Sequence, residues 1–159
     1  MNLFFKRLAS ALCTLVAAIA LSSTVVAASD REDADFVGCR GPGRITCVVD
    51  GDTFWYQGRK IRIADINAPE VSHPACAREA ALGATATRRL TELLNAGPFS
   101  LAIEGREIDR YGRALRVVLR RGVSLGGQLE RDGLAEHWQG RRGDWCAMSI
   151  KPRAGPLDL

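Results

Sequence analysis

The stretch that decides the fold is residues 45–70, ITCVVDGDTFWYQGRKIRIADINAPE. Apolar and polar residues alternate through its first part, and Asp50-Gly51 then marks a turn or bulge. A β-branched and aromatic segment follows at residues 53–56, and after a second turn residues 60–66 alternate again. The stretch therefore predicts three consecutive β-strands.

The segments after this stretch predict helices packed on a small barrel. An apolar stripe at helical spacing predicts a long helix, which Gly97-Pro98 would stop. The predicted elements are a helix over 76–96, strands over 99–103 and 113–120, and a short helix that Ser124 would cap and that ends near Gly133. This order indicates an α+β domain whose β-barrel is closed or partly open.

The first 28 residues are typical of a secretory signal. Lys6 and Arg7 form a cationic start, a small and apolar run extends over residues 8–26, and Ala27-Ala28 offers a cleavage site. The run is also about long enough to span a bilayer, so a membrane anchor is the alternative. Cleavage predicts a secreted or periplasmic protein with no stable membrane association.

The remaining chain has little net charge to attract a polyanion. Without Lys6 and Arg7, 20 basic residues face 18 acidic ones, so local clusters must carry any nucleic-acid binding. Residues 29–43 are polar, acidic and then rich in Gly and Pro, which predicts a flexible leader. Residues 139–159 lack an apolar period, which predicts an irregular tail. Arg141-Arg142 in this tail could follow a nucleic-acid backbone, but solvation is favoured for such a pair.

Four cysteines follow the signal: Cys39, Cys47, Cys76 and Cys146. An even number in an exported protein indicates disulfides, and three pairings are possible. We favour Cys39–Cys47, which is local, and Cys76–Cys146, which would hold an otherwise loose tail. A zinc site is disfavoured because the chain has no CxxC spacing.

Three separated segments, residues 49–53, 62–70 and 109–113, supply the groups that phosphodiester cleavage needs. A hard cation with oxygen ligands polarises the phosphoryl group, and Asp52 is the candidate ligand. The planar fork of arginine grips phosphate oxygens, and Arg62 and Arg113 are the candidates. A carboxylate can activate the attacking water, and Glu70 is the candidate base.

Taken together, these segments resemble the thermonuclease (staphylococcal nuclease) family. That family has a D-G-D-T turn, an R-x-x-x-x-D-x-P-E stretch and a D-[KR]-Y-G-R turn in the same order and at similar intervals. The likeness covers roughly residues 44–138. It implies a five-stranded OB-fold nuclease domain and Ca²⁺-dependent cleavage of DNA and RNA that leaves 3′-phosphate ends.

The resemblance also implies a role for each matching residue. Asp52 matches a metal-ligand aspartate, and Arg62 and Arg113 match the two catalytic arginines. Glu70 matches the glutamate that serves as general base. Ala68 matches the position whose backbone carbonyl binds calcium.

One position departs from the family pattern: Asn67 stands where the second metal-ligand aspartate is expected. An amide oxygen can bind calcium but carries no charge, so weaker metal binding or another metal preference is expected. Asp65 is a candidate substitute ligand, because residues two apart on a regular strand share a face.

The third segment also supplies candidate substrate contacts. Arg110 could contact phosphate or only water, and Tyr111 could stack on a base or pack under the turn. The favoured function is a monomeric exported nuclease that acts on DNA, RNA or both. The alternative is a related module that binds nucleic acid or protein without cleaving, which Asn67 favours and the retained Arg62, Glu70 and Arg113 oppose.

Overall fold

The computed structural model describes residues 29–147. The signal segment expected at residues 1–28 and the end of the expected tail, residues 148–159, lie outside the described residues. Within residues 29–147, no helix is long and apolar enough to cross a membrane.

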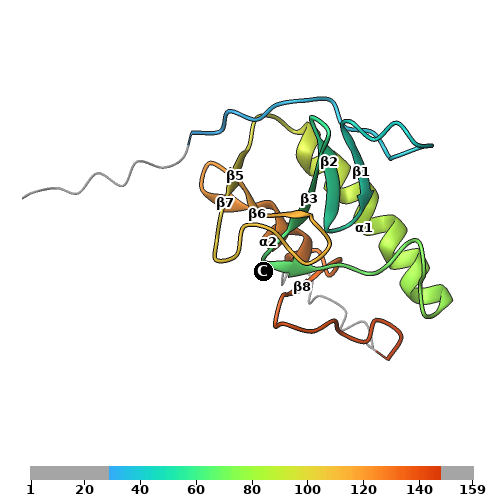
Figure 1. Cartoon of the computed structure of the whole chain (residues 1–159). Helices are drawn as coiled ribbons and strands as arrows, with labels where there is room; N and C mark the ends of the chain where they lie inside the picture. The colour runs from blue at the N-terminus through green and yellow to red at the C-terminus, as the bar shows by residue number, and fades with distance from the viewer. Residues whose placement is uncertain (1–28, 148–159) are drawn as a thin grey trace, which may run out of the picture.

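An antiparallel meander of three strands starts the domain, as the alternation predicted (Figure 1). It consists of β1 (Cys47–Asp50), β2 (Thr53–Tyr56) and β3 (Arg59–Ile63). The pairing register shifts between Val48 and Asp50, so the last part of β1 contains a bulge just before the Asp50-Gly51 turn.

The second half of the sheet begins with β6 (Ala114–Arg120), which pairs in parallel with β3. β5 (Ser100–Ala102) and β7 (Val123–Ser124) are antiparallel to β6. The order β1-β2-β3-β6-β5 agrees with an OB-like α+β fold. The sheet is open, since β1 and β5 are its two edges and form no ladder with each other in the described residues.

Part of the leader lies across this open side of the sheet. Isolated bridges join Glu32 to Phe99, next to β5, and Gly38 to Val48 in β1. In Figure 1 the blue segment accordingly runs from the β5 side to the β1 side. The structure therefore differs from the expected flexible leader, because backbone groups at both edges have partners in it.

Phe36 explains why the leader packs in spite of its polarity. Its side chain is 2% exposed and lies against the rings of Phe54, Tyr56 and Phe99. The side chain of Asn95 accepts from the Phe36 amide at 2.8 Å and donates to its carbonyl at 2.9 Å. One buried aromatic ring and the two hydrogen bonds of the Asn95 side chain thus fix the leader against the domain, although its composition suggests a loose segment.

The predicted long helix is α1 (Ala77–Asn95), and its buried face carries Ala86, Leu90, Leu93 and Leu94. Cys76 caps its start, where the sulfur accepts from the backbone N–H of Glu79. At its end, Arg120 donates to backbone carbonyls of Leu93, Leu94, Gly97 and Pro98. Arg120 thereby satisfies carbonyls that a helix end leaves without partners.

The strand predicted over residues 60–66 is divided in two. After β3, Asp65 turns its side chain away to accept from Ser124 Oγ at 2.7 Å. Ser124 also caps the second helix, α2 (Leu125–Arg131), as predicted. The chain then continues as β4 (Ile66–Asn67), which pairs with β8 (Glu136–His137) instead of the main sheet.

Candidate active site

The bulge after β1 presses the first motif against the second. Gly51 lies so close to α1 that a Cβ there would stand 2.6 Å from Cβ of Ala86 and 2.7 Å from Cβ of Ala68. Only glycine permits this approach. It brings Asp52 close enough to accept from the backbone N–H of Ala68 at 3.1 Å.

Asp52 and Arg62 form a buried ion pair across β2 and β3. The Arg62 guanidinium lies 3.3 Å from Asp52 Oδ2, and the two side chains are 9% and 12% exposed. Thr53 donates to the other carboxylate oxygen at 2.8 Å, and Arg62 also donates to the carbonyl of Ile63. The guanidinium lies over the ring of Trp138, 4.8 Å from its centroid. Arg62 is therefore held rigidly from several sides.

Asp50 adds a second acidic group beside this pair. Burial, and then repulsion from Asp52 and Glu70, raise the pKa of Asp50 to about 7. The Asp50 carboxylate also accepts from the backbone N–H of Asp52 at 3.1 Å. Asp50 and Asp52 of the first motif and Glu70 of the second thus share one electrostatic environment.

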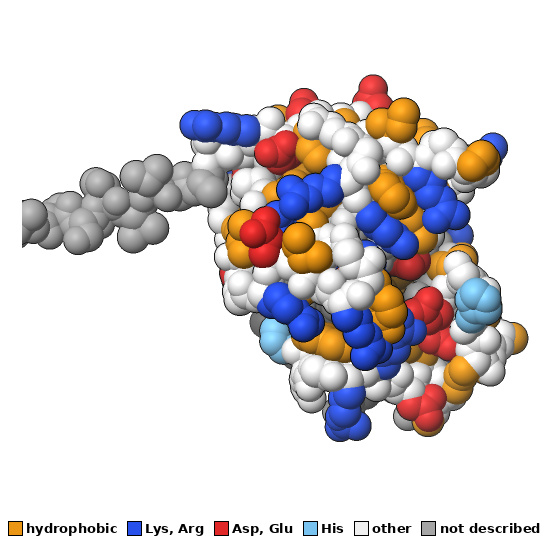
Figure 2. Space-filling model, viewed as in Figure 1, with side chains coloured by type: hydrophobic (Ala, Val, Ile, Leu, Met, Phe, Trp, Pro, Cys, Tyr) orange, Lys and Arg blue, Asp and Glu red, His pale blue; other side chains and the backbone are white. Residues whose placement is uncertain are grey.

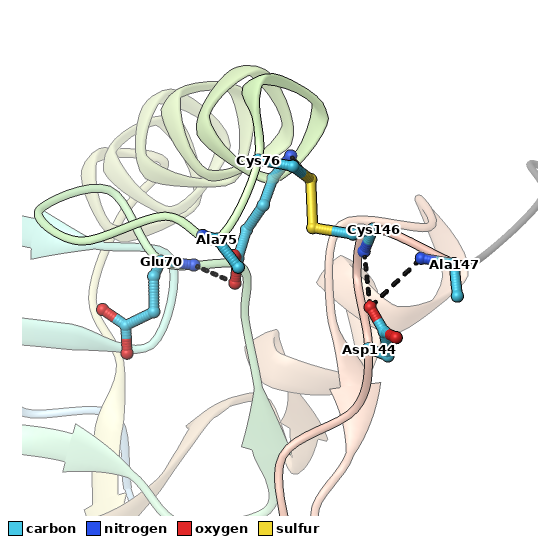
Figure 3. Close-up of a disulfide and its surroundings, with 7 residues drawn as sticks. Glu70, Ala75, Cys76, Asp144, Cys146 and Ala147 are labelled. Atoms are coloured by element: carbon cyan, nitrogen blue, oxygen red, sulfur yellow. Dashed lines mark hydrogen bonds between the residues drawn. A yellow bond between two sulfur atoms is a disulfide. The ribbon is translucent and has the colours of Figure 1, made fainter.

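Glu70 is held at its backbone by the start of α1. Its N–H donates to the buried carboxylate of Glu79 at 3.2 Å, and Glu79 also accepts from Ala75 at 2.6 Å (Figure 3). A Cβ on Gly83 would stand 2.8 Å from the Glu70 carbonyl oxygen, so glycine is required where α1 meets this loop. Figure 3 shows the Glu70 side chain turned away from α1.

The third motif forms a tight turn before β6. Asp109 accepts from the backbone N–H of Arg113 at 2.9 Å and from its Nε at 2.6 Å. Burial alone would raise the pKa of Asp109, but these bonds and one from the Tyr111 amide lower it. Arg110 donates to the Tyr111 hydroxyl at 2.7 Å, and the guanidinia of Arg110 and Arg113 lie near the Tyr111 ring. Tyr111 is 67% exposed, so its ring does not pack under the turn.

The second and third motifs meet at one open pocket of about 370 Å³. Asp52 and Glu70 are not part of its lining, but each contacts an arginine that is, Arg62 and Arg142 respectively. Basic side chains are numerous on the face of the molecule that Figure 2 draws. The pocket walls include five arginines and a single acid, Asp109, which already pairs with Arg113. The arginines are Arg62, Arg106, Arg110, Arg113 and Arg142. Such a concentration of guanidinium groups suits a phosphate ligand.

Arg142 reaches this pocket from the irregular tail. It forms an ion pair with Glu70, which differs from the solvated side chain that the sequence favoured there. Both disulfides that the sequence favoured are present, and Cys76–Cys146 joins the tail to the start of α1 beside Glu70 (Figure 3). The bridge explains how a segment without regular structure contributes to the site.

The predicted metal ligands Asp52 and Ala68 are joined by a hydrogen bond, but the side chains of both Asp52 and Asn67 already have partners. Asn67 is 2% exposed and donates from Nδ2 to Glu136 at 3.0 Å. Its amide oxygen, the Asp52 carboxylate and the backbone of Ala68 are oxygen donors of the type that calcium prefers. Within residues 29–147, no three His, Cys, Asp or Glu side chains are grouped to hold a metal. A calcium site here would therefore depend on neutral oxygens in addition to Asp52.

Asp65 does not substitute for the missing aspartate. Its carboxylate contacts Ser124, and a Cβ on Gly126 would lie 3.1 Å from it. The expectation that Asp65 shares a face with Asn67 fails because the strand breaks between β3 and β4.

Several residues of the site were missed by the sequence reasoning. Glu79 occupies the third helical position after the cap, which is a known signal for a side chain that reaches back to preceding amides. Gly83 interrupts an otherwise good helix, which often marks a close approach. No comparable signal marks Arg106, Glu136 or Trp138.

Comparison with known proteins agrees with the second and third motifs. A family profile described as staphylococcal nuclease homologue matches residues 60–146. Endonuclease YncB of Bacillus subtilis (strain 168) is 36% identical over 93 residues, which span 55% of this chain and 43% of that relative. The chain thus covers less than half of the relative's length. Arg62, Glu70, Arg113 and Arg142 lie within the matched range, and Asp52 precedes it.

Proposed function

Since the chain belongs to the staphylococcal nuclease homologue family, we propose that it is a calcium-dependent nuclease that hydrolyses phosphodiester bonds in DNA, RNA or both. The observation that carries this proposal is the pocket where five arginines adjoin the Asp52–Arg62 pair and Glu70. A phosphodiester brings the negative charge that these guanidinia would compensate, and Glu70 contacts Arg142 in the wall of the same pocket.

In this proposal the two rigid arginines bind the scissile phosphate. Arg62 is fixed by Asp52, and Arg113 is fixed through its Nε by Asp109. Donors that are already oriented stabilise the charge that develops on the phosphoryl oxygens without reorganisation at the moment of reaction. Arg110 and Tyr111 lie on the exposed turn, where they would contact the neighbouring phosphate and base.

Glu70 is the proposed general base, which takes a proton from the attacking water. Cleavage on the 5′-oxygen side then leaves a 3′-phosphate and a 5′-hydroxyl. Asp52, the Asn67 amide oxygen and the Ala68 carbonyl would hold calcium. When bound, this ion would supply further positive charge to polarise the phosphoryl group.

A second candidate function has a specific observation in its favour. The Asn67 amide is neutral and is hydrogen-bonded to Glu136, so the metal site has fewer charged ligands than the family pattern implies. Calcium affinity follows ligand charge. A module that binds nucleic acid without efficient cleavage is therefore the alternative.

We further propose that the protein is exported and acts as a monomer. Two disulfides within the described residues suit an oxidising compartment, in agreement with the signal expected at residues 1–28.

The mature protein should be incubated with labelled single-stranded DNA at several millimolar calcium and, in parallel, with chelator. The proposal expects degradation only with calcium and products that carry 3′-phosphates. Tight binding without cleavage in calcium, magnesium or manganese would establish the alternative instead.

A further inference from the structure

Residues 139–146, here called the tethered arm, are fixed at three points without being part of the sheet. Cys146 is bonded to Cys76 at the start of α1, and Trp145 is 6% exposed. Between these anchors and β8, the Gly143 amide donates to Glu136 at 2.6 Å. A side chain at position 143 would overlap the Glu136 carboxylate, so glycine lets the arm lie close to β8.

Of the two adjacent arginines in the arm, Arg142 alone lines the five-arginine pocket, where it joins Arg62 and Arg113 and pairs with Glu70. Arg141 lines only a second hollow, beside Glu136 and His137, which Arg142 also borders. The Arg142 side chain is 61% exposed, so a ligand that enters the pocket can reach it.

The geometry points to Arg142 as a substrate-binding residue of the proposed nuclease, held over the site by the Cys76–Cys146 disulfide. This inference rests on the proposed function and deepens it. We infer that Arg142 pairs with Glu70 in the free protein and transfers to a phosphate next to the scissile one when substrate enters. The exchange replaces one anion by another and leaves Glu70 free to accept a proton from water.

The charge balance of the pocket supports a phosphate contact over a purely structural ion pair. Asp109 is the only acid in its lining and already accepts from Arg113, so it cannot also compensate Arg142. An exposed ion pair contributes little to stability, which makes a structural purpose for Arg142–Glu70 weak. A strand of nucleic acid carries regularly spaced phosphates, and an arginine beyond the scissile position would bind one of them.

The test measures binding and cleavage separately. Fluorescence anisotropy gives the Kd for labelled oligo(dT) in chelator across a range of salt concentrations, and initial rates with calcium give kcat and KM. The variants are Arg142→Ala, Arg142→Lys, the matched control Arg141→Ala, and Cys76→Ser/Cys146→Ser. Serine is itself a good N-cap, so the double variant removes the tether while keeping the cap of α1.

Arg142→Ala is expected to weaken binding roughly tenfold, as for one charge-assisted contact, and to raise KM more than it lowers kcat. The slope of log Kd against log salt should fall by about 0.7, the value for one phosphate contact on a single strand. Arg142→Lys should keep most of the salt slope, and Arg141→Ala should behave as wild type. The double serine variant should lose as much affinity as Arg142→Ala.

Several outcomes would overturn the inference. Unchanged Kd and salt slope in Arg142→Ala, or no measurable binding by the wild type, would show that Arg142 does not hold substrate. Faster cleavage by Arg142→Ala at unchanged KM would make the arm inhibitory. Wild-type affinity in the double serine variant would remove the disulfide's positioning role. Binding that depends on Arg142 without any cleavage would reject the nuclease proposal alone, and cleavage that ignores Arg142 would reject this inference alone.

Discussion

The Arg62 guanidinium lies 3.3 Å from a carboxylate oxygen of Asp52, with both side chains almost fully buried. Taking two charges out of water is costly, and each is tolerated because the other is present. Arg62 and Asp52 come from two different sequence motifs, so this contact joins the phosphate-binding and metal-binding parts of the candidate site.

Arg62→Met keeps much of the side-chain volume and removes the charge. It leaves Asp52 buried without its cation, so the free energy of unfolding should fall by about 3–5 kcal/mol. Urea denaturation in the presence of chelator measures this free energy for the variant and the wild type. Arg59→Met is the matched control, because the Arg59–Glu107 pair is more than half exposed at 3.7 Å and should be worth less than about 1 kcal/mol. Equal effects in the two variants would contradict the burial argument.

Asp50 should make the metal-free protein less stable as pH rises. Its pKa is about 7 in the folded protein, against 3.8 as the ordinary value, so the folded state binds more protons between these values. The contribution of Asp50 to the free energy of unfolding should be greatest below pH 4. It should decrease by roughly 4 kcal/mol in total as the pH rises from 4 to 7. Asp50→Asn should abolish this part of the pH dependence. If the free energy of unfolding changes with pH in the same way for both proteins between pH 4 and pH 8, the assignment to Asp50 is wrong.

How far the sequence predicts this fold depends on whether a segment carries its own periodic signal. The meander β1–β3 and the helix α1 were predicted because alternation and helical spacing extend over whole elements. Both disulfides followed from cysteine number and spacing. The packed leader could not be predicted, because one buried ring, Phe36, outweighs a polar composition.

The same limit applies to the candidate site. The motif residues could be named because three motifs occur together. Arg62, Arg110, Tyr111 and Arg113 line one pocket, and Asp52 and Glu70 contact its arginines. Arg142 belongs to no motif and reaches the site through the covalent bond of Cys146 four residues away. The divided strand after β3 depends on the Asp65–Ser124 contact, which joins residues 59 positions apart.

Asn67→Asp should restore metal affinity only when its neighbour is changed too. The Asn67 amide donates to Glu136, so an aspartate there would face another carboxylate at hydrogen-bonding distance. We expect Asn67→Asp alone to gain little. Asn67→Asp/Glu136→Gln should lower the calcium concentration for half-maximal activity about tenfold or more, since affinity tracks ligand charge. The quantity to measure is the calcium titration of initial rates for wild type, both single variants and the double variant. Identical titrations for all four proteins would remove Asn67 from the metal site.

Arg120→Ala should destabilise the protein by about 1–3 kcal/mol, because it leaves helix-end carbonyls without their donor. Arg120 donates to the carbonyls of Leu93 and Pro98 at 2.7 and 3.0 Å, among others. Arg121→Ala is the control, and a surface change of this kind should stay within about 0.5 kcal/mol. Thermal unfolding of both variants provides the comparison. A wild-type melting temperature for Arg120→Ala would show that the cap is dispensable.

Glu70 is the proposed general base of metal-dependent hydrolysis, acting with Arg62 and Arg113 of the five-arginine pocket. The most direct measurement is the single-turnover cleavage rate of Glu70→Gln on single-stranded DNA at saturating calcium. Loss of a general base should lower this rate by about 10²–10⁴-fold, while affinity for the DNA in chelator stays at or above the wild-type value. A Glu70→Gln protein that cleaves at the wild-type rate would contradict the claim.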